Sequence, residues 1–98
     1  MGANATAPIK RFGDWSSKVK GTNYQADSDG FVIAEADYDK VASGYTDGDA
    51  NPTTLRGRCN TINVTRYSTI CMPVKKNDYW RVDCTGDLQL LYWIPLLP

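Results

Sequence analysis

The side chains of this 98-residue chain that could bind a metal ion are aspartates at a regular spacing. Three Asp-x-Asp pairs recur ten residues apart, at Asp27/Asp29, Asp37/Asp39 and Asp47/Asp49. The residues around these pairs do not repeat, and ten residues is also the period of a short strand plus a turn. We therefore expect the aspartates at loop tips, where this residue is favoured.

The segment 46–52 is the richest in oxygen ligands. Asp47, Asp49 and Asn51 match the first three ligand positions of an EF-hand calcium loop. Pro52 stands where that loop requires Gly, and Arg58 stands where it requires a bidentate Glu, so an EF-hand is excluded. A less regular calcium site at Asp47, Asp49 and Asn51 is a weaker alternative. We otherwise expect neither a metal nor a cofactor.

The chain contains no His, which excludes Ser-His and Cys-His catalysis and His-ligated zinc or haem sites. A glycosidase needs only two carboxylates, but it holds them across a cleft, and a chain of this length has little material for one. We expect that the protein is not an enzyme.

Tyrosines near polar loops point instead to binding. Tyr38, Tyr45 and Tyr67 lie in or beside segments rich in Asp, Asn, Gly and Ser. Recognition surfaces favour this composition, because a rigid ring provides contact area at a low entropy cost. A sugar-binding site would use the same parts. The predicted receptor contacts are Tyr38, Tyr45, Asp47, Asp49, Asn51 and Tyr67, and the alternative is that these tyrosines pack at strand ends.

The composition favours strands as the elements that hold these side chains. Val, Ile, Thr, Tyr, Phe and Trp make up 31 of 98 residues, and ten Asp against one Glu favour turns over helices. We predict strands at 30–36, 60–67, 70–74, 79–84 and 88–94, with shorter ones at 11–15, 18–25, 40–45 and 54–59. The segments 79–84 and 88–94 are predicted to form a hairpin that Pro95 ends. Short strands at this spacing indicate an antiparallel β-sandwich or jelly roll.

The last predicted strand is apolar on both faces. Leu88, Leu90, Tyr92 and Ile94 share one face, and Leu91 and Trp93 share the other. A strand in a single antiparallel sheet usually has one wet face. We therefore predict that Leu91, Trp93, Leu96 and Leu97 contact a neighbouring subunit. The alternative is a central strand that the chain covers itself.

The bulk properties bound the partners. Eleven basic residues balance eleven acidic ones, so the chain has no electrostatic reason to bind nucleic acid. No apolar run is long enough to cross a bilayer, and the start of the chain does not resemble a signal peptide. We expect one domain over residues 12–98 and a tether, or the end of a shaft, over residues 1–11. Three cysteines are expected as free, partly buried thiols, with one intrachain disulfide as the alternative.

Three stretches together resemble a known family. Residues 28–34 (SDGFVIA), residues 45–56 (YTDGDANPTTLR), and residues 72–82 (MPVKKNDYWRV) with 92–96 (YWIPL) are similar to C-terminal domains of bacteriophage tail fibres and related virion proteins. The C-terminal motif is the most specific of the three. Asn77 departs from the family pattern, which has Gly there, but Asn tolerates the left-handed conformation that such a turn uses.

The resemblance implies a jelly-roll β-sandwich that forms a homotrimer at the host-facing end of a virion fibre and binds a bacterial surface receptor, often a glycan. The motif residues look structural, so none is carried over as a receptor contact. Two other functions stay open. One is a structural virion protein, such as a capsid decoration or a fibre-trimerising cap, and the other is a bacterial lectin-like module.

Overall fold

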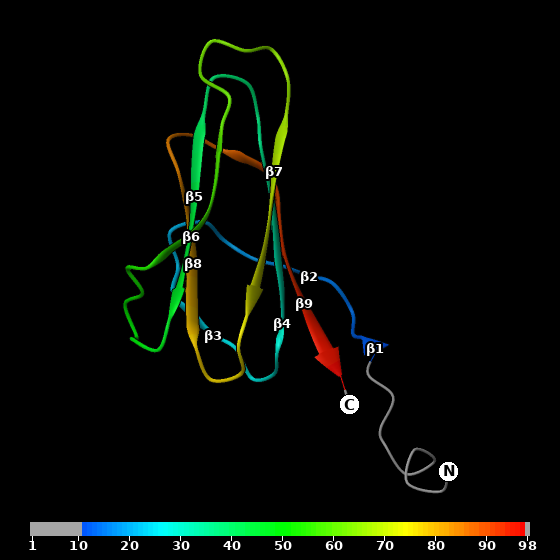
Figure 1. Ribbon diagram of the computed structural model, residues 1–98. Helices are drawn as coiled ribbons and strands as arrows, with labels where there is room; N and C mark the ends of the chain where they lie inside the picture. The colour runs from blue at the N-terminus through cyan, green and yellow to red at the C-terminus, as the bar shows by residue number, and fades with distance from the viewer. Residues whose placement is uncertain (1–10, 98) are drawn as a thin grey trace, which may run out of the picture.

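The computed structural model describes residues 11–97, and within that range the chain forms nine strands and no helix. The strands lie in two antiparallel sheets (Figure 1), which confirms the prediction of an all-β fold of the β-sandwich kind. The predicted tether at residues 1–11 lies outside the described residues, apart from Arg11. The strands are β1 (Arg11–Phe12), β2 (Ser16–Ser17), β3 (Tyr24–Gln25), β4 (Gly30–Ala36), β5 (Val41–Asp47), β6 (Leu55–Asn60), β7 (Ser68–Val74), β8 (Tyr79–Cys84) and β9 (Leu88–Leu97).

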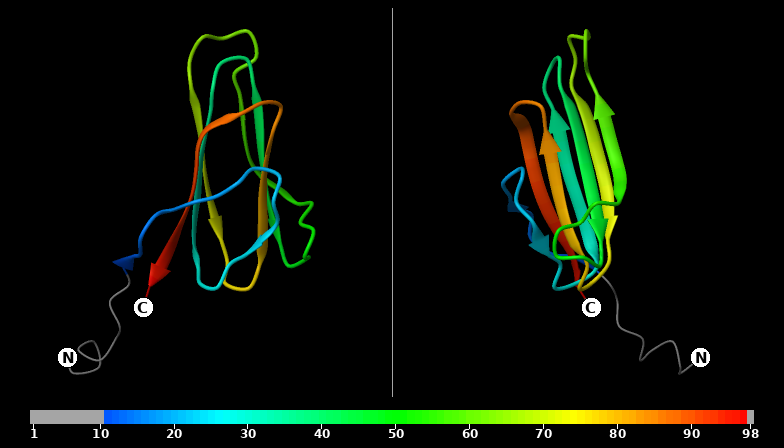
Figure 2. Two further views of the ribbon diagram at one scale, coloured as in Figure 1. Left: turned by 180° about the vertical axis from the view of Figure 1, so that it is seen from behind. Right: turned by 90° about the vertical axis from the view of Figure 1, so that its left-hand side faces the viewer.

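The order of the strands follows a nested pattern. The first sheet runs β1-β9-β4-β7, with β2 also paired to β9, and the second runs β3-β8-β5-β6. Strand β2 pairs with β9, β3 with β8, β4 with β7, and β5 with β6, all antiparallel. The chain therefore runs out through β2 to β5 and returns through β6 to β9, and each returning strand lies beside its outgoing counterpart (Figure 2).

Alternating side chains build the core between the sheets. In β4 the residues Val32 and Ala34 are fully buried while their neighbours are partly exposed, as expected when one face of a strand faces a core. The rings of Trp80 from β8 and Trp93 from β9 stack across the core, with their centroids 6.1 Å apart. Gly30 makes room for this pair, because a Cβ atom there would lie 2.6 Å from the Trp93 ring.

The strand predictions were correct in their bounds for two segments. Strands β4 and β8 begin and end where predicted, and Trp80 and Val82 of β8 face the core. The predicted hairpin of 79–84 with 88–94 is wrong, because β8 and β9 lie in different sheets. Thr85 holds the connection against β5 instead: its N–H donates to the Val41 carbonyl, and its hydroxyl accepts from the Val41 N–H, each at 3.0 Å.

Two other expectations need correction. Pro95 does not end the last strand, because β9 continues to Leu97, where Leu96 and Leu97 pair with β1. The alternating segment 60–67 is not a strand after Asn60. It forms a loop in which Asn63 has a positive φ of 63° and Ile62 is exposed, because buried Thr61 bonds the neighbouring loop rather than a strand.

No helix within residues 11–97 is long and apolar enough to cross a membrane. The three thiols occupy different environments, with Cys59 buried, Cys84 partly buried and Cys71 exposed, and all three are free.

Candidate functional site

Two tyrosines that are distant in sequence meet at one end of the sandwich. Tyr38 lies in the turn between β4 and β5, and Tyr67 ends the loop between β6 and β7. Their ring centroids are 5.1 Å apart at an interplanar angle of 33°. The two side chains stay 44% and 49% exposed, so the pair is an aromatic surface that the chain itself leaves uncovered.

This tyrosine pair lies far from the ends of the described chain. Arg11 pairs with Leu97, and the nearby Pro95 pairs with Gly30 at the start of β4. Tyr38 follows the opposite end of β4 (Figure 1). A strand rises about 3.3 Å per residue, so the seven residues of β4 place roughly 20 Å between the two ends of the sandwich.

Thr61 joins the two loops that carry the tyrosines. Its side chain is 1% exposed. Its Oγ1 accepts from the Lys40 N–H at 2.8 Å and donates to the Asp37 carbonyl at 2.6 Å. Backbone bonds from Asp39 N–H to the Thr61 carbonyl and from Thr61 N–H to the Lys40 carbonyl complete the junction. Thr61 therefore holds the two loops, and with them the rings, in one arrangement.

Polar groups surround the ring pair. The Asp37 carboxylate accepts from the Tyr38 N–H at 2.6 Å and from the Gln89 side-chain amide at 2.9 Å, and an Asp39 oxygen accepts from the Asn63 N–H at 3.0 Å. Repulsion from Tyr38, and next from the Asp37 carboxylate, raises the pKa of Tyr67 above its usual value. The Tyr67 hydroxyl is protonated at neutral pH, as that of an unperturbed Tyr also is, and can donate a hydrogen bond.

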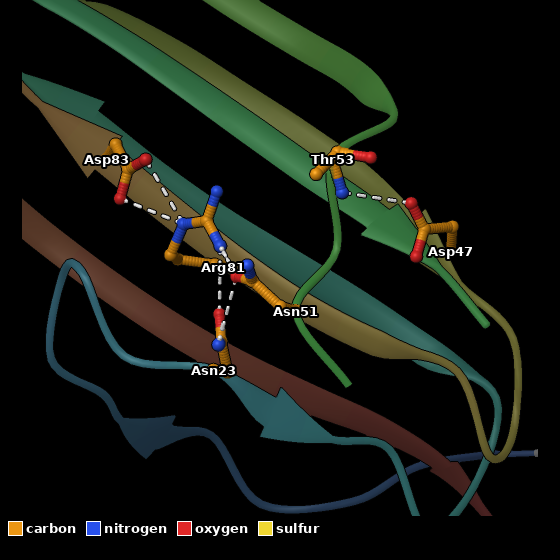
Figure 3. A network of polar contacts seen from close by, with 6 residues as sticks. All are labelled: Asn23, Asp47, Asn51, Thr53, Arg81 and Asp83. Carbon is orange, nitrogen blue, oxygen red and sulfur yellow. Dashed lines mark hydrogen bonds and ion pairs between the residues drawn. The ribbon is translucent and has the colours of Figure 1, made fainter. Parts of the chain in front are cut away.

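The other predicted contacts lie toward the opposite end of β5. The Arg81 guanidinium packs over the Tyr45 ring, 4.9 Å from its centroid. Its Nη1 donates to Asn23 at 2.9 Å and to Asn51 at 3.0 Å, and its Nε donates to Asp83 at 3.1 Å (Figure 3). Arg81 therefore joins two loops to β8, and one face of the Tyr45 ring is already covered.

The Asp47 carboxylate holds the loop between β5 and β6 in place. It accepts from the N–H groups of Asp49, Thr53 and Thr54 at 2.9, 3.0 and 3.0 Å. These bonds, with the Thr53 N–H contributing most, lower the pKa of Asp47 to about 2. Figure 3 shows Asp47 aimed at Thr53 and Asn51 aimed at Arg81. The Asp47 and Asn51 side chains of the calcium alternative thus bind the protein itself. Residues 11–97 contain no cluster of three or more His, Cys, Asp or Glu that could hold a metal.

Two of the four predicted subunit contacts are buried within the protomer, and the other two are at least partly exposed. Leu91 and Trp93 are 5% and 8% exposed and belong to the protomer's own core, so the expectation that they contact a neighbour is wrong. The reason is that β9 is a central strand, with β1 and β2 on one side, β4 on the other, and the second sheet against its inner face. Leu96 is partly exposed and Leu97 is 39% exposed, so these two remain available.

A groove of about 780 Å³ lies between the β2 and β3 edges of the two sheets. Tyr24, Trp80 and Trp93 contribute to its lining together with Asp27 and other charged side chains. The two tryptophans expose less than a tenth of their surface, so a ligand would meet little ring face there. The tyrosine pair is the better candidate.

The structure therefore brings together two of the six predicted receptor contacts, Tyr38 and Tyr67, and places Tyr45, Asp47, Asp49 and Asn51 on or after β5. Sequence reasoning missed Thr61 and Gln89 around the pair and Arg81 in the second network, and it noted Asp37 only as a member of a spaced Asp pair. The contacts that join these residues to other parts of the chain could not be seen in the sequence, since they span 21 to 58 residues. No family model matches this chain, and comparison with curated proteins and with solved structures also found no match.

Proposed function

We propose that this chain is the tip domain of a bacteriophage tail fibre, acting in the virion as a homotrimer that binds a bacterial surface glycan. The observation that carries the receptor role is the Tyr38–Tyr67 pair, half-exposed and held rigidly at the end of the sandwich remote from Arg11 and Leu97. A fibre shaft joined through the N-terminal end of the domain would present this pair to the host.

The nested strand order supports a sandwich of jelly-roll type. Strands β1 and β2 pair with successive parts of β9, so together they occupy one edge position. Counted in this way, residues 11–97 form eight strands in two sheets of four. An eight-stranded double sheet is the architecture of jelly rolls, which occur in viral and lectin domains.

The chemistry of the tyrosine pair suits a sugar. An aromatic face takes the C–H face of a pyranose, while nearby hydroxyl, carboxylate and amide groups exchange hydrogen bonds with the sugar hydroxyls. Here the two phenol groups, the Asp37 carboxylate and the Asn63 side chain lie on the same pair of loops. Because Thr61 fixes these loops before binding, little ordering entropy is lost on association.

The test is the binding of purified domain to host cells and to a glycan array. The double variant Tyr38→Ala/Tyr67→Ala should weaken binding about 30-fold or more, since an aromatic anchor at the centre of an interface contributes about 2 kcal/mol or more. Tyr38→Phe keeps the ring and should retain most of the affinity. Tyr45→Ala is the matched variant at the other end and should leave binding unchanged. Loss of binding in Tyr45→Ala alone would move the site to the Arg81 network.

A structural virion protein is the second candidate, and the large exposed side chains of Phe12 and Trp15 favour it, because such side chains suit assembly contacts. A domain that neither binds host cells nor blocks phage adsorption, yet still assembles, would favour a decoration protein or a trimerising cap.

A further inference from the structure

The outer faces of the two sheets differ in chemistry. On the second sheet the residues that alternate with the core positions are mostly polar, and they include Ser43 and Asp47 on β5, Arg58 and Asn60 on β6, and Arg81 and Asp83 on β8. A sandwich in water normally has polar residues on both outer faces. The outer face of the first sheet does not follow this rule.

The apolar face of the first sheet is formed by Phe12, Trp15, Phe31, Ile33, Tyr92 and Ile94. Phe31 and Ile33 alternate with the buried Val32 and Ala34 of β4, so they point away from the core. The register places Ile94 beside Phe31 and Tyr92 beside Ile33.

Aromatic contacts extend the apolar face across the sheet. The rings of Phe12 and Phe31 are 5.9 Å apart, and those of Trp15 and Tyr92 are 5.6 Å apart in an edge-on arrangement. The apolar face thus continues from β4 over β9 to the segment that holds β1 and β2.

Charge is nearly absent from this face. Among the outward-pointing residues of the described strands β4, β7 and β9, Glu35 is the only Asp, Glu, Lys or Arg. The β7 edge adds Cys71 and Pro73, which are both exposed and pair with Ile33 and Phe31 of β4. A partner that covers this face must therefore be apolar as well.

The exposed area is large for a protein of this size. Phe12 is 62% exposed and Trp15 is 58% exposed. Since an aromatic side chain has about 150–250 Å² to bury, these two rings present roughly 250 Å². With the partly exposed neighbours the patch is on the order of 500 Å², at the upper end of what monomers expose. A stable interface buries roughly 800 Å² per partner, so the apolar patch would supply its centre and the surrounding residues its rim.

We infer that further copies of this chain cover the apolar face. The partner must match an uncharged apolar surface, and the opposite sheet face of the chain is polar, so the apolar face itself is the matching surface. The net charge of zero adds no repulsion between copies. In the proposed homotrimer the apolar faces of the three copies would meet around the three-fold axis, so that each face contacts both neighbours. This inference rests on the oligomer of the proposed function and identifies its surface, in place of Leu91 and Trp93.

Sedimentation velocity at about 10 µM tests the surface on the full chain without a receptor. The wild type should sediment as an oligomer of the 10.9-kDa chain. Ile33→Lys places a charge at the centre of the face, where it would meet other lysines across the interface, so the dissociation constant should rise about 100-fold or more. Val41→Lys is the matched control, since Val41 is a partly exposed outer residue of β5 in the opposite sheet, and it should associate as the wild type does.

A second variant protects the test against misfolding of Ile33→Lys. Phe12→Ser/Trp15→Ser removes two rings that are more than half exposed, so the core should stay intact by circular dichroism while association weakens. Alkylation of Cys71 gives an independent readout and should be slow in the wild type and fast in both face variants.

The outcomes separate this inference from the proposed function. A monomeric wild type, or equal association of the Ile33→Lys and Val41→Lys proteins, overturns the apolar face as the interface. If the wild-type protein is an oligomer but does not bind host cells, the receptor role is overturned and the interface stays supported.

Discussion

Replacing Thr61 by Val tests whether the junction between the two tyrosine loops depends on one buried hydroxyl. Val keeps the shape of the side chain and removes two hydrogen bonds, one accepted from the Lys40 N–H and one donated to the Asp37 carbonyl. Each bond contributes about 1 kcal/mol, and a buried N–H left without a partner costs a further 1–3 kcal/mol or so. We therefore expect a loss of about 3–5 kcal/mol, which is a large part of the total for a small domain.

The assay is urea denaturation followed by circular dichroism at one fixed protein concentration, because association shifts apparent stability. The midpoint should fall while the m-value stays constant. Thr65→Val is the control, since Thr65 is exposed in the same loop, and it should change stability by less than about 0.5 kcal/mol. A loss below about 0.5 kcal/mol in Thr61→Val would refute the assignment of Thr61 as the junction.

Two further predictions concern the core and the β5–β6 loop. Gly30→Ala should destabilise the fold by about 1–3 kcal/mol in thermal unfolding, because its Cβ would lie 2.6 Å from the Trp93 ring. Gly48→Ala is the control and should not destabilise the fold, since its Cβ would meet nothing closer than 3.9 Å. Equal effects of the two substitutions would contradict the packing argument. The depressed pKa of Asp47 should stabilise the fold above the usual value of 3.8, and this stabilisation should be lost as the pH falls through about 2. Asp47→Asn should flatten the acid-unfolding curve between pH 4 and 2, and an unchanged curve would show that the Asp47 carboxylate does not contribute.

The positions of the strands follow largely from local pattern. β8 alternates apolar and polar residues along most of its length, and β4 is a nearly continuous apolar run, and both strands have the predicted bounds. The Asp pairs also lie in turns or at strand ends, as their turn preference indicates. The segment 60–67 shows the limit of such a pattern, since its alternation is interrupted when Thr61 bonds Lys40 and Asp37 across the tip.

The pairing of the strands could not be read from the same pattern. Strands β8 and β9 are close in the chain and looked like a hairpin, yet β8 pairs with β3 and β5 while β9 pairs with β4. Pairing depends on which apolar faces can be buried together, and that depends on all the strands at once. For the same reason, the two apolar faces of β9 were visible in the sequence, but which one faces the core was not.

For the candidate site too, the sequence indicates the kind of function, whereas the fold decides which residues meet. Composition indicates binding rather than catalysis, because the chain lacks His and has tyrosines beside polar loops. That Tyr38 meets Tyr67, whereas Tyr45 meets Arg81, depends on contacts between residues 29 and 36 positions apart. Local propensity acts over a few residues and sets strands and turns, whereas the nested folding of the chain sets which loops meet at each end and which sheet face is left apolar.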